Sequence, residues 1–196
     1  MYRRALLPTM LLFLSSAAQA HTGVGDTNGF AHGFLHPVGG IDHVLVMVAV
    51  GLFAVHLGGR ALWLVPLSFV SMMIAGGALG MAGVGLPFVE IGIGLSVVML
   101  GIAVAFGVNL PTVAAMAMVG LFAIFHGHAH GAEMPESVSG LGYAAGFVIA
   151  TATLHGCGIG LGLLLGKLSE AQETRISRLA GSAMALAGLA ILGGII

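Results

Sequence analysis

Two short polar segments interrupt an otherwise apolar sequence, and the first is HPVGGIDH at residues 36–43. In one continuous helix, His36 and His43 are two turns apart and lie within about 20° of each other around the axis. Asp42 then lies at the edge of their shared face, where its carboxylate would either ligate an ion or orient an imidazole. The segment therefore predicts an ion-binding group near the start of a helix.

The second polar segment, FHGHAHGAEMP at residues 125–135, repeats this combination of residue types. His126, His130 and Glu133 fall at i, i+4 and i+7, so one stripe of a helix carries all three. His128 points to the opposite side and is expected to lie at headgroup level or in a loop, with a ligand role as the alternative. Glu90 begins a further apolar segment near the same membrane surface.

These groups are expected to meet at one depth, because an imidazole or carboxylate facing lipid alone costs several kcal/mol. A buried polar network that only clamps helices together is the alternative. Neutral imidazole with carboxylate suits a borderline divalent ion, Ni²⁺, Co²⁺ or Zn²⁺, better than Cu⁺ or Ca²⁺. The single Cys157 excludes a multi-thiolate site and an internal disulfide. The predicted metal ligands are His36, Asp42, His43, Glu90, His126, His130 and Glu133.

The remaining histidines are candidates for a relay or for capture of an ion. His155 and His56 lie deeper in their segments and would form an exit path. The favoured alternatives are a hydrogen bond from His155 to Thr151, an interfacial His56 and a packing role for Cys157. At the other end of the path, His21 would combine with His32 in an external capture site if His21 became the mature amino terminus.

The elements that position these groups are membrane helices. The chain has 196 residues, of which 58% are hydrophobic and 7% charged, and its mean hydropathy is +1.10, far above that of a soluble domain. Nine histidines outnumber the six lysines and arginines. Six apolar segments are long enough to cross a bilayer: 34–57, 61–82, 86–107, 110–133, 140–166 and 176–196.

The first twenty residues resemble a secretory signal, with Arg3 and Arg4, a short apolar stretch and small residues before His21. An uncleaved first span is the alternative. Cleavage places both mature termini outside, and every basic residue of the mature chain then falls on the inner side, as expected for cytoplasmic loops. The sequence thus predicts an all-α fold: a signal peptide at 1–20 and a six-helix transmembrane permease domain at 21–196.

A short internal sequence repeat suggests that the two halves of the chain are related. VGLFAVH at 50–56 recurs as VGLFAIFH at 119–126, which predicts an inverted 3+3 repeat unless the match is chance. Glycines at small-xxx-small spacing, such as Gly76 with Gly80 and Gly158 with Gly162, predict close helix packing.

The two polar segments, HPVGGIDHVLVMVAVGLFA and FHGHAHGAEMP, resemble the signature segments of the HupE/UreJ nickel permeases. These are small bacterial inner-membrane proteins often encoded with hydrogenase or urease genes. The resemblance covers the whole chain and implies uptake of nickel as a transported substrate for a nickel enzyme, with maturation proteins downstream by family analogy. It also implies that His36, Asp42, His43, His130 and Glu133 are functional. Larger nickel/cobalt permeases are similar, with a spacing one residue shorter.

Other functions fit less well. A membrane-embedded metalloenzyme is disfavoured because the sequence contains no H-E-x-x-H motif and no nucleophile elbow. A haem-binding membrane protein is the third hypothesis, since histidines at matched depth on different helices hold haem iron. No basic run indicates nucleic acid, and no organic cofactor or nucleotide-binding loop is expected. A homo-oligomer, and the choice among nickel, cobalt and zinc, remain open from the sequence.

Overall fold

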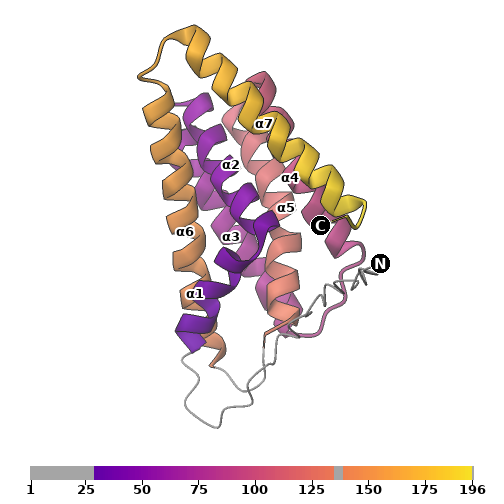
Figure 1. The fold of residues 1–196 in the computed structure, drawn as a ribbon. Helices are drawn as coiled ribbons and strands as arrows, with labels where there is room; N and C mark the ends of the chain where they lie inside the picture. Colours follow the sequence, from indigo (N-terminus) through magenta and orange to yellow (C-terminus); the bar gives the residue numbers. More distant parts are fainter. Residues whose placement is uncertain (1–28, 135–138, 196) are drawn as a thin grey trace, which may run out of the picture.

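The computed structural model describes residues 29–134 and 139–195, and within these ranges it contains seven helices and no strand (Figure 1). The predicted signal peptide, His21 and Pro135 lie outside the described residues. The helices run up and down along one bundle axis. Their bounds are α1 Gly29–Gly39, α2 Ile41–Leu57, α3 Ala61–Met81, α4 Val89–Phe106, α5 Thr112–Ala132, α6 Gly140–Leu165 and α7 Glu170–Leu192.

The first predicted segment is not one helix, and this part of the prediction is wrong. α1 and α2 meet at Gly40 with a bend of 82°, because Gly40 has extended backbone angles (φ −98°, ψ 122°) that interrupt the helical hydrogen bonds. Pro37 lies inside α1, and its missing N–H weakens the helix just before the break. His36 and His43 therefore belong to different helices.

Five helices, α3 to α7, are long and apolar enough to cross a membrane, and the bent α1–α2 pair brings the count to six if it acts as one span. The bounds of α3 to α6 agree with the predicted segments to within a few residues. By contrast, α7 begins at Glu170, six residues before the predicted start at 176. A capping box between Ser169 and Gln172 starts this helix, so its first turns are polar rather than apolar.

The helices pack in close pairs: α3 with α5, α4 with α7, and both α1 and α2 with α6. Glycines allow the close approach. A Cβ atom on Gly158 of α6 would overlap the Val48 carbonyl of α2, and one on Gly76 of α3 would overlap the Ile124 carbonyl of α5. The predicted use of small residues for helix packing is thus seen in both pairs.

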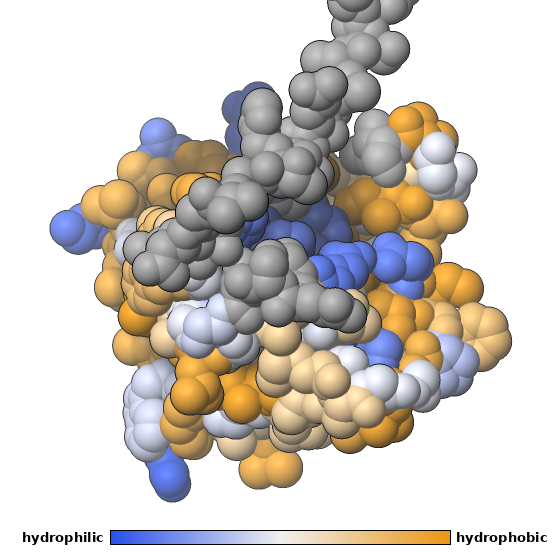
Figure 2. Space-filling view, turned by 90° about the horizontal axis from the view of Figure 1, so that it is seen from below, coloured by the Kyte–Doolittle hydropathy of each residue, from blue (hydrophilic) through white to orange (hydrophobic). Residues whose placement is uncertain are grey.

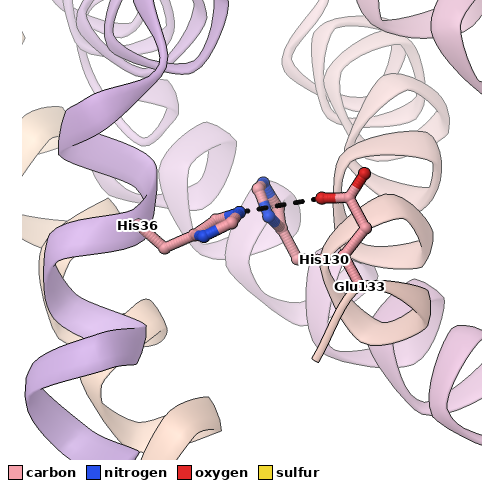
Figure 3. Close-up of side chains that lie close together, drawn as sticks. All are labelled: His36, His130 and Glu133. Atoms are coloured by element: carbon pink, nitrogen blue, oxygen red, sulfur yellow. Dashed lines mark ion pairs between the residues drawn. The ribbon is translucent and has the colours of Figure 1, made fainter. Parts of the chain in front are cut away.

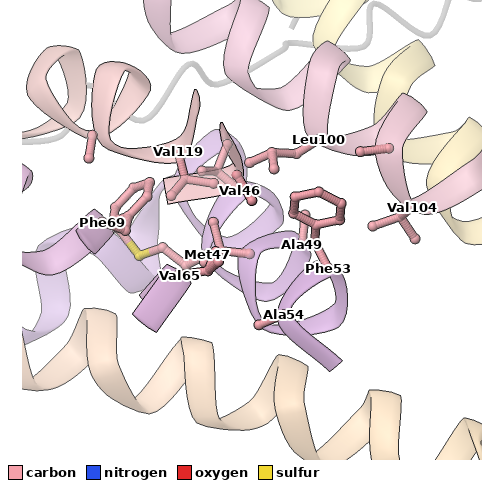
Figure 4. Close-up of a cluster of buried hydrophobic side chains, with 14 of the residues drawn as sticks. Val46, Met47, Ala49, Phe53, Ala54, Val65, Phe69, Leu100, Val104 and Val119 are labelled. Carbon is pink, nitrogen blue, oxygen red and sulfur yellow. The ribbon is translucent and has the colours of Figure 1, made fainter. Parts of the chain in front are cut away.

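α2 is the central helix and contacts α3, α4, α5, α6 and α7. Its residues Val46, Val50 and Phe53 are fully buried, and they pack with Phe69 and Leu100 in the apolar core (Figure 4). Many large apolar side chains on the outer helices are exposed instead, as expected for a surface in contact with lipid. The core holds α2 in place, and with it His43 in the first turn of α2.

Charged residues are divided between the two ends of the bundle. The connections α2–α3 and α6–α7 lie at the end opposite α1 (Figure 1). All four lysines and arginines of the described residues are in these connections or in the first three turns of α7: Arg60, Lys167, Arg175 and Arg178. This end is called the basic end below.

Candidate metal site

A cavity of about 790 Å³ opens at the end of the bundle opposite the basic end, and it is called the pocket. Residues from α1, α2, α4 and α5 line it. Seen from this end, hydrophilic residues gather at the centre of the face with apolar residues around them (Figure 2). Six of the seven predicted ligands line the pocket: His36, Asp42, His43, Glu90, His130 and Glu133.

His36, His130 and Glu133 come together in the pocket. His36 Nε2 lies 3.8 Å from Glu133 Oε2, and the rings of His36 and His130 meet edge to face with centroids 4.6 Å apart. Figure 3 shows the His36 ring reaching from α1 toward the end of α5. One possible ligand atom from each of the three lies within 4.8 Å of the others. Donors around a shared ion at about 2.1 Å lie at most about 4.2 Å apart, so only a small closure would join all three on one ion.

His43 is held by its neighbour Asp42, and the arrangement fixes which nitrogen is free. His43 Nδ1 donates to Asp42 Oδ1 at 2.8 Å, so the neutral ring keeps a lone pair on Nε2. That lone pair faces His130 Nε2 at 2.6 Å. Because the carboxylate of Asp42 can only accept, the His43 proton is on Nδ1 and His43 Nε2 is an acceptor. His130 Nε2 is therefore the donor of the second hydrogen bond. Asp42 is thus hydrogen-bonded to an imidazole of the pocket, which is the geometry expected for the orienting role, one of the two roles that the sequence left open.

His126 is the one predicted ligand that does not line the pocket. It lies directly behind His43, with ring centroids 5.0 Å apart, and it is fully buried. Its Nδ1 donates to the Phe122 carbonyl at 3.0 Å, which leaves the lone pair on Nε2. Within the described part of the chain, that Nε2 has no hydrogen-bond partner.

Glu90 and His32 are exposed residues on the pocket wall. Glu90 lies in the first turn of α4, and His32 lies one turn before His36 on α1. Neither belongs to the close group of His36, His130 and Glu133. They extend the polar surface of the pocket toward its opening.

His128 does not line the pocket, and it lies inside α5 rather than in a loop. It is 8% exposed, and its Nε2 donates to the Val84 carbonyl in the α3–α4 connection at 2.7 Å. The helix carries it inward because α5 packs closely on α3. His128 therefore fastens this connection to α5.

Of the deeper candidates, His155 and Cys157 differ from the sequence expectation. The Thr151 hydroxyl donates to the Met73 sulfur at 3.5 Å, and His155 has no hydrogen-bond partner among the described residues; the expected bond between Thr151 and His155 is therefore wrong. Cys157 is exposed rather than packed. His56 is exposed near the basic end and lines a second cavity of about 620 Å³.

Two aromatic residues of α6 pack against the histidine rings of the pocket, and they were not predicted from the sequence. Tyr143 lies 6.1 Å from the His36 ring and Phe147 lies 4.3 Å from the His130 ring, between centroids. Their i, i+4 spacing on α6 is the only sequence signal, and apolar membrane helices show such spacing commonly. Together the contacts make a site with imidazole and carboxylate donors against an aromatic wall, a chemistry suited to a divalent transition ion.

Comparisons with known proteins agree over almost the whole chain. The family model described as HupE / UreJ protein matches residues 9–191. Protein HupE of Rhizobium leguminosarum bv. viciae is 47% identical over 194 residues, which cover 98% of this chain and 99% of that protein. No solved structure matches the chain.

Proposed function

The chain belongs to the HupE/UreJ family, a family of transport and accessory proteins rather than enzymes, and from that premise we propose that it is a permease that imports divalent nickel. The observation that carries the proposal is the pocket. Seven titratable groups from four helices line it, at one end of a bundle whose outer surface is apolar. Nickel is the proposed main substrate, and cobalt and zinc suit the same donors.

The proposed orientation places the pocket on the periplasmic side of the bacterial inner membrane. The four basic residues lie at the other end, which is the distribution expected for a cytoplasmic face. With α1 and α2 as one bent span, a domain at 21–196 has six spans and two periplasmic termini after cleavage before His21. Amino-terminal sequencing of the mature protein tests this; a protein that begins at Met1 would contradict it.

The pairing of helices supports the proposed inverted repeat. In such a repeat, α2, α3 and α4 of the first half correspond to α5, α6 and α7 of the second half. The α2–α6 pair then corresponds to the α5–α3 pair, and the α4–α7 pair corresponds to itself. A transporter built in this way would carry its ion between the two halves.

In the proposed loading step, the ion takes the lone pair of His43 Nε2 and adds His36, His130 and Glu133 as ligands. The carboxylate of Glu133 offsets part of the charge, and Asp42 keeps the His43 proton on Nδ1. The His130 N–H competes with the ion for His43, so the two rings separate as the ion enters. The His130 proton then moves from Nε2 to Nδ1, which has no hydrogen-bond partner among the described residues, and Nε2 is left with a lone pair for the ion. A porphyrin does not fit between these rings, whose Nε2 atoms are 2.6 Å apart, and this disfavours the haem hypothesis.

Capture and release would occupy the two ends of the path. His32 on the pocket wall, with His21 at the new terminus, is the proposed capture site. The second cavity, lined by His56, Glu170 and Arg178, is the proposed exit. By family analogy, the released nickel would supply the maturation of a hydrogenase or urease.

Metal accumulation in cells that lack their own high-affinity nickel uptake tests the function. Cells that express the protein should accumulate nickel at least tenfold above cells with an empty vector, and the His43→Ala variant should lose this accumulation. His128→Ala is the matched control, because His128 is a buried histidine that does not line the pocket. Nickel accumulation no greater than with the empty vector, at normal expression, would contradict the proposal. Parallel assays with cobalt and zinc determine selectivity.

A further inference from the structure

A line of buried rings leads from the pocket into the middle of the bundle. The His43 ring lies 5.0 Å from His126, His126 lies 5.7 Å from Phe69, and Phe69 lies 5.1 Å from His155, between centroids in each case. The four residues come from α2, α5, α3 and α6. The line therefore runs through the centre of the bundle, between four helices.

The line leads from the pocket toward the middle of the membrane. His126 is six residues before the end of α5 at the pocket end, or about 9 Å along the axis. His155 is fifteen residues after the start of α6 at the same end, or about 22 Å. Within a hydrocarbon layer of about 30 Å, both rings are therefore away from the membrane surface, and His155 is the deeper of the two.

Nitrogen atoms along this line are buried without partners. His126 Nε2 and both ring nitrogens of His155 have no hydrogen-bond partner in the described residues, and the two side chains are 0% and 2% exposed. Such groups destabilise a fold, and buried polar atoms are nearly always paired. A purely structural role for His155 would be served better by an apolar side chain of similar size.

Two further donor residues lie one helical turn from the rings of this line: Thr151 from His155 on α6, and Met73 from Phe69 on α3. The Thr151 hydroxyl donates to the sulfur of Met73. Both residues are buried. Imidazole, hydroxyl and thioether form a neutral and weaker donor set than the pocket, which suits a site that an ion must leave again.

We propose that His155 is a second, inner binding site for the divalent metal ion, which it receives from His126, and that the Phe69 ring closes the path between them. This inference rests on the proposed transport function and extends it across the membrane. His126 already presents an unprotonated Nε2, since its Nδ1 donates to the Phe122 carbonyl. The ion moves from His126 to His155 when the Phe69 side chain turns aside.

The test uses the full-length protein in liposomes that contain a nickel-sensitive dye, with Ni²⁺ added outside. The initial rate of entry should fall at least tenfold in His155→Leu, and His128→Leu is the matched control that should keep at least half of the rate. Equilibrium dialysis at saturating Ni²⁺ should show one bound ion fewer for His155→Leu than for the wild type. The affinity of the outer pocket should stay within about twofold of the wild type.

A rate within twofold of the wild type in His155→Leu, or unchanged nickel stoichiometry, overturns the inner site. If the wild type itself carries no nickel, the transport function fails, and the dialysis still decides whether His155 binds an ion. His155→Gln is the second variant if His155→Leu does not fold, since it also removes the imidazole. Transport by His155→Gln at the wild-type rate would overturn the proposal.

Discussion

Asp42→Asn is the most informative change in the pocket, because it keeps the size of the side chain and removes its charge. In the wild type, the carboxylate accepts the His43 Nδ1 proton at 2.8 Å and is 24% exposed. An asparagine amide either accepts that proton more weakly or turns and donates to Nδ1. In the second case the His43 proton moves to Nε2, and the ligand lone pair is lost.

The expected loss of nickel affinity in Asp42→Asn follows from the strength of the hydrogen bond between Asp42 and His43. A hydrogen bond to a charged group contributes about 1.5–3 kcal/mol, and removal of a carboxylate that orients a ligand typically weakens metal affinity about 10- to 100-fold. We therefore expect Asp42→Asn to bind Ni²⁺ about 10- to 100-fold more weakly, equivalent to about 1.4–2.8 kcal/mol. The fold should survive, since the residue lies at the rim of the pocket rather than in the apolar core.

Isothermal titration of purified protein with Ni²⁺ measures this difference, and the Asp42→Glu variant is the control. Glutamate keeps the charge and should recover part of the affinity. An Asp42→Asn affinity within threefold of the wild type would show that Asp42 does not orient His43 in the ion-bound protein.

Three other predictions concern the pocket and its supporting helices. His36→Ala should abolish nickel uptake at normal protein levels, because it removes one of the three close donors; normal accumulation would exclude His36 as a ligand. Nickel binding to purified protein should weaken as pH falls through the histidine range, since a protonated imidazole has no lone pair for a metal; binding that is constant from pH 7.5 to about 5 would contradict histidine ligation. Gly158→Val should destabilise the protein by about 1–3 kcal/mol or more, because its side chain would overlap the Val48 carbonyl. Thermal unfolding in detergent measures this last effect against Gly156→Val, whose side chain would meet no neighbour.

The second polar segment shows how far helical spacing predicts a site. His126 and His130 lie on one side of α5, with Glu133 at its C-cap, and His128 lies on the other side, as the i, i+4 and i+7 positions indicate. Sequence spacing alone nevertheless does not separate His130, which lines the pocket, from His126, which lies behind it. That difference depends on how deeply α2 packs beside α5.

The first polar segment shows the limit of the same reasoning. His36 and His43 do meet near His130, yet they do so across a bend and not along one helix face. Gly39 and Gly40 allow either a continuous or a broken helix. Packing of α1 against α6 decides between them, since Gly33 of α1 contacts the Tyr143 backbone of α6. Such a contact between distant segments is not encoded in local spacing.

The break at Gly40 also changes the electrostatics of the pocket. A helix that ends there leaves carbonyl oxygens of its last turn without intrahelical partners, and these carry a partial negative charge. Gly39, the last residue of α1, lines the pocket, so this end of the helix dipole lies beside the entering cation. Backbone carbonyls do not titrate in the physiological range. Their attraction for a divalent ion therefore persists at low pH, when the histidines are protonated and no longer bind it.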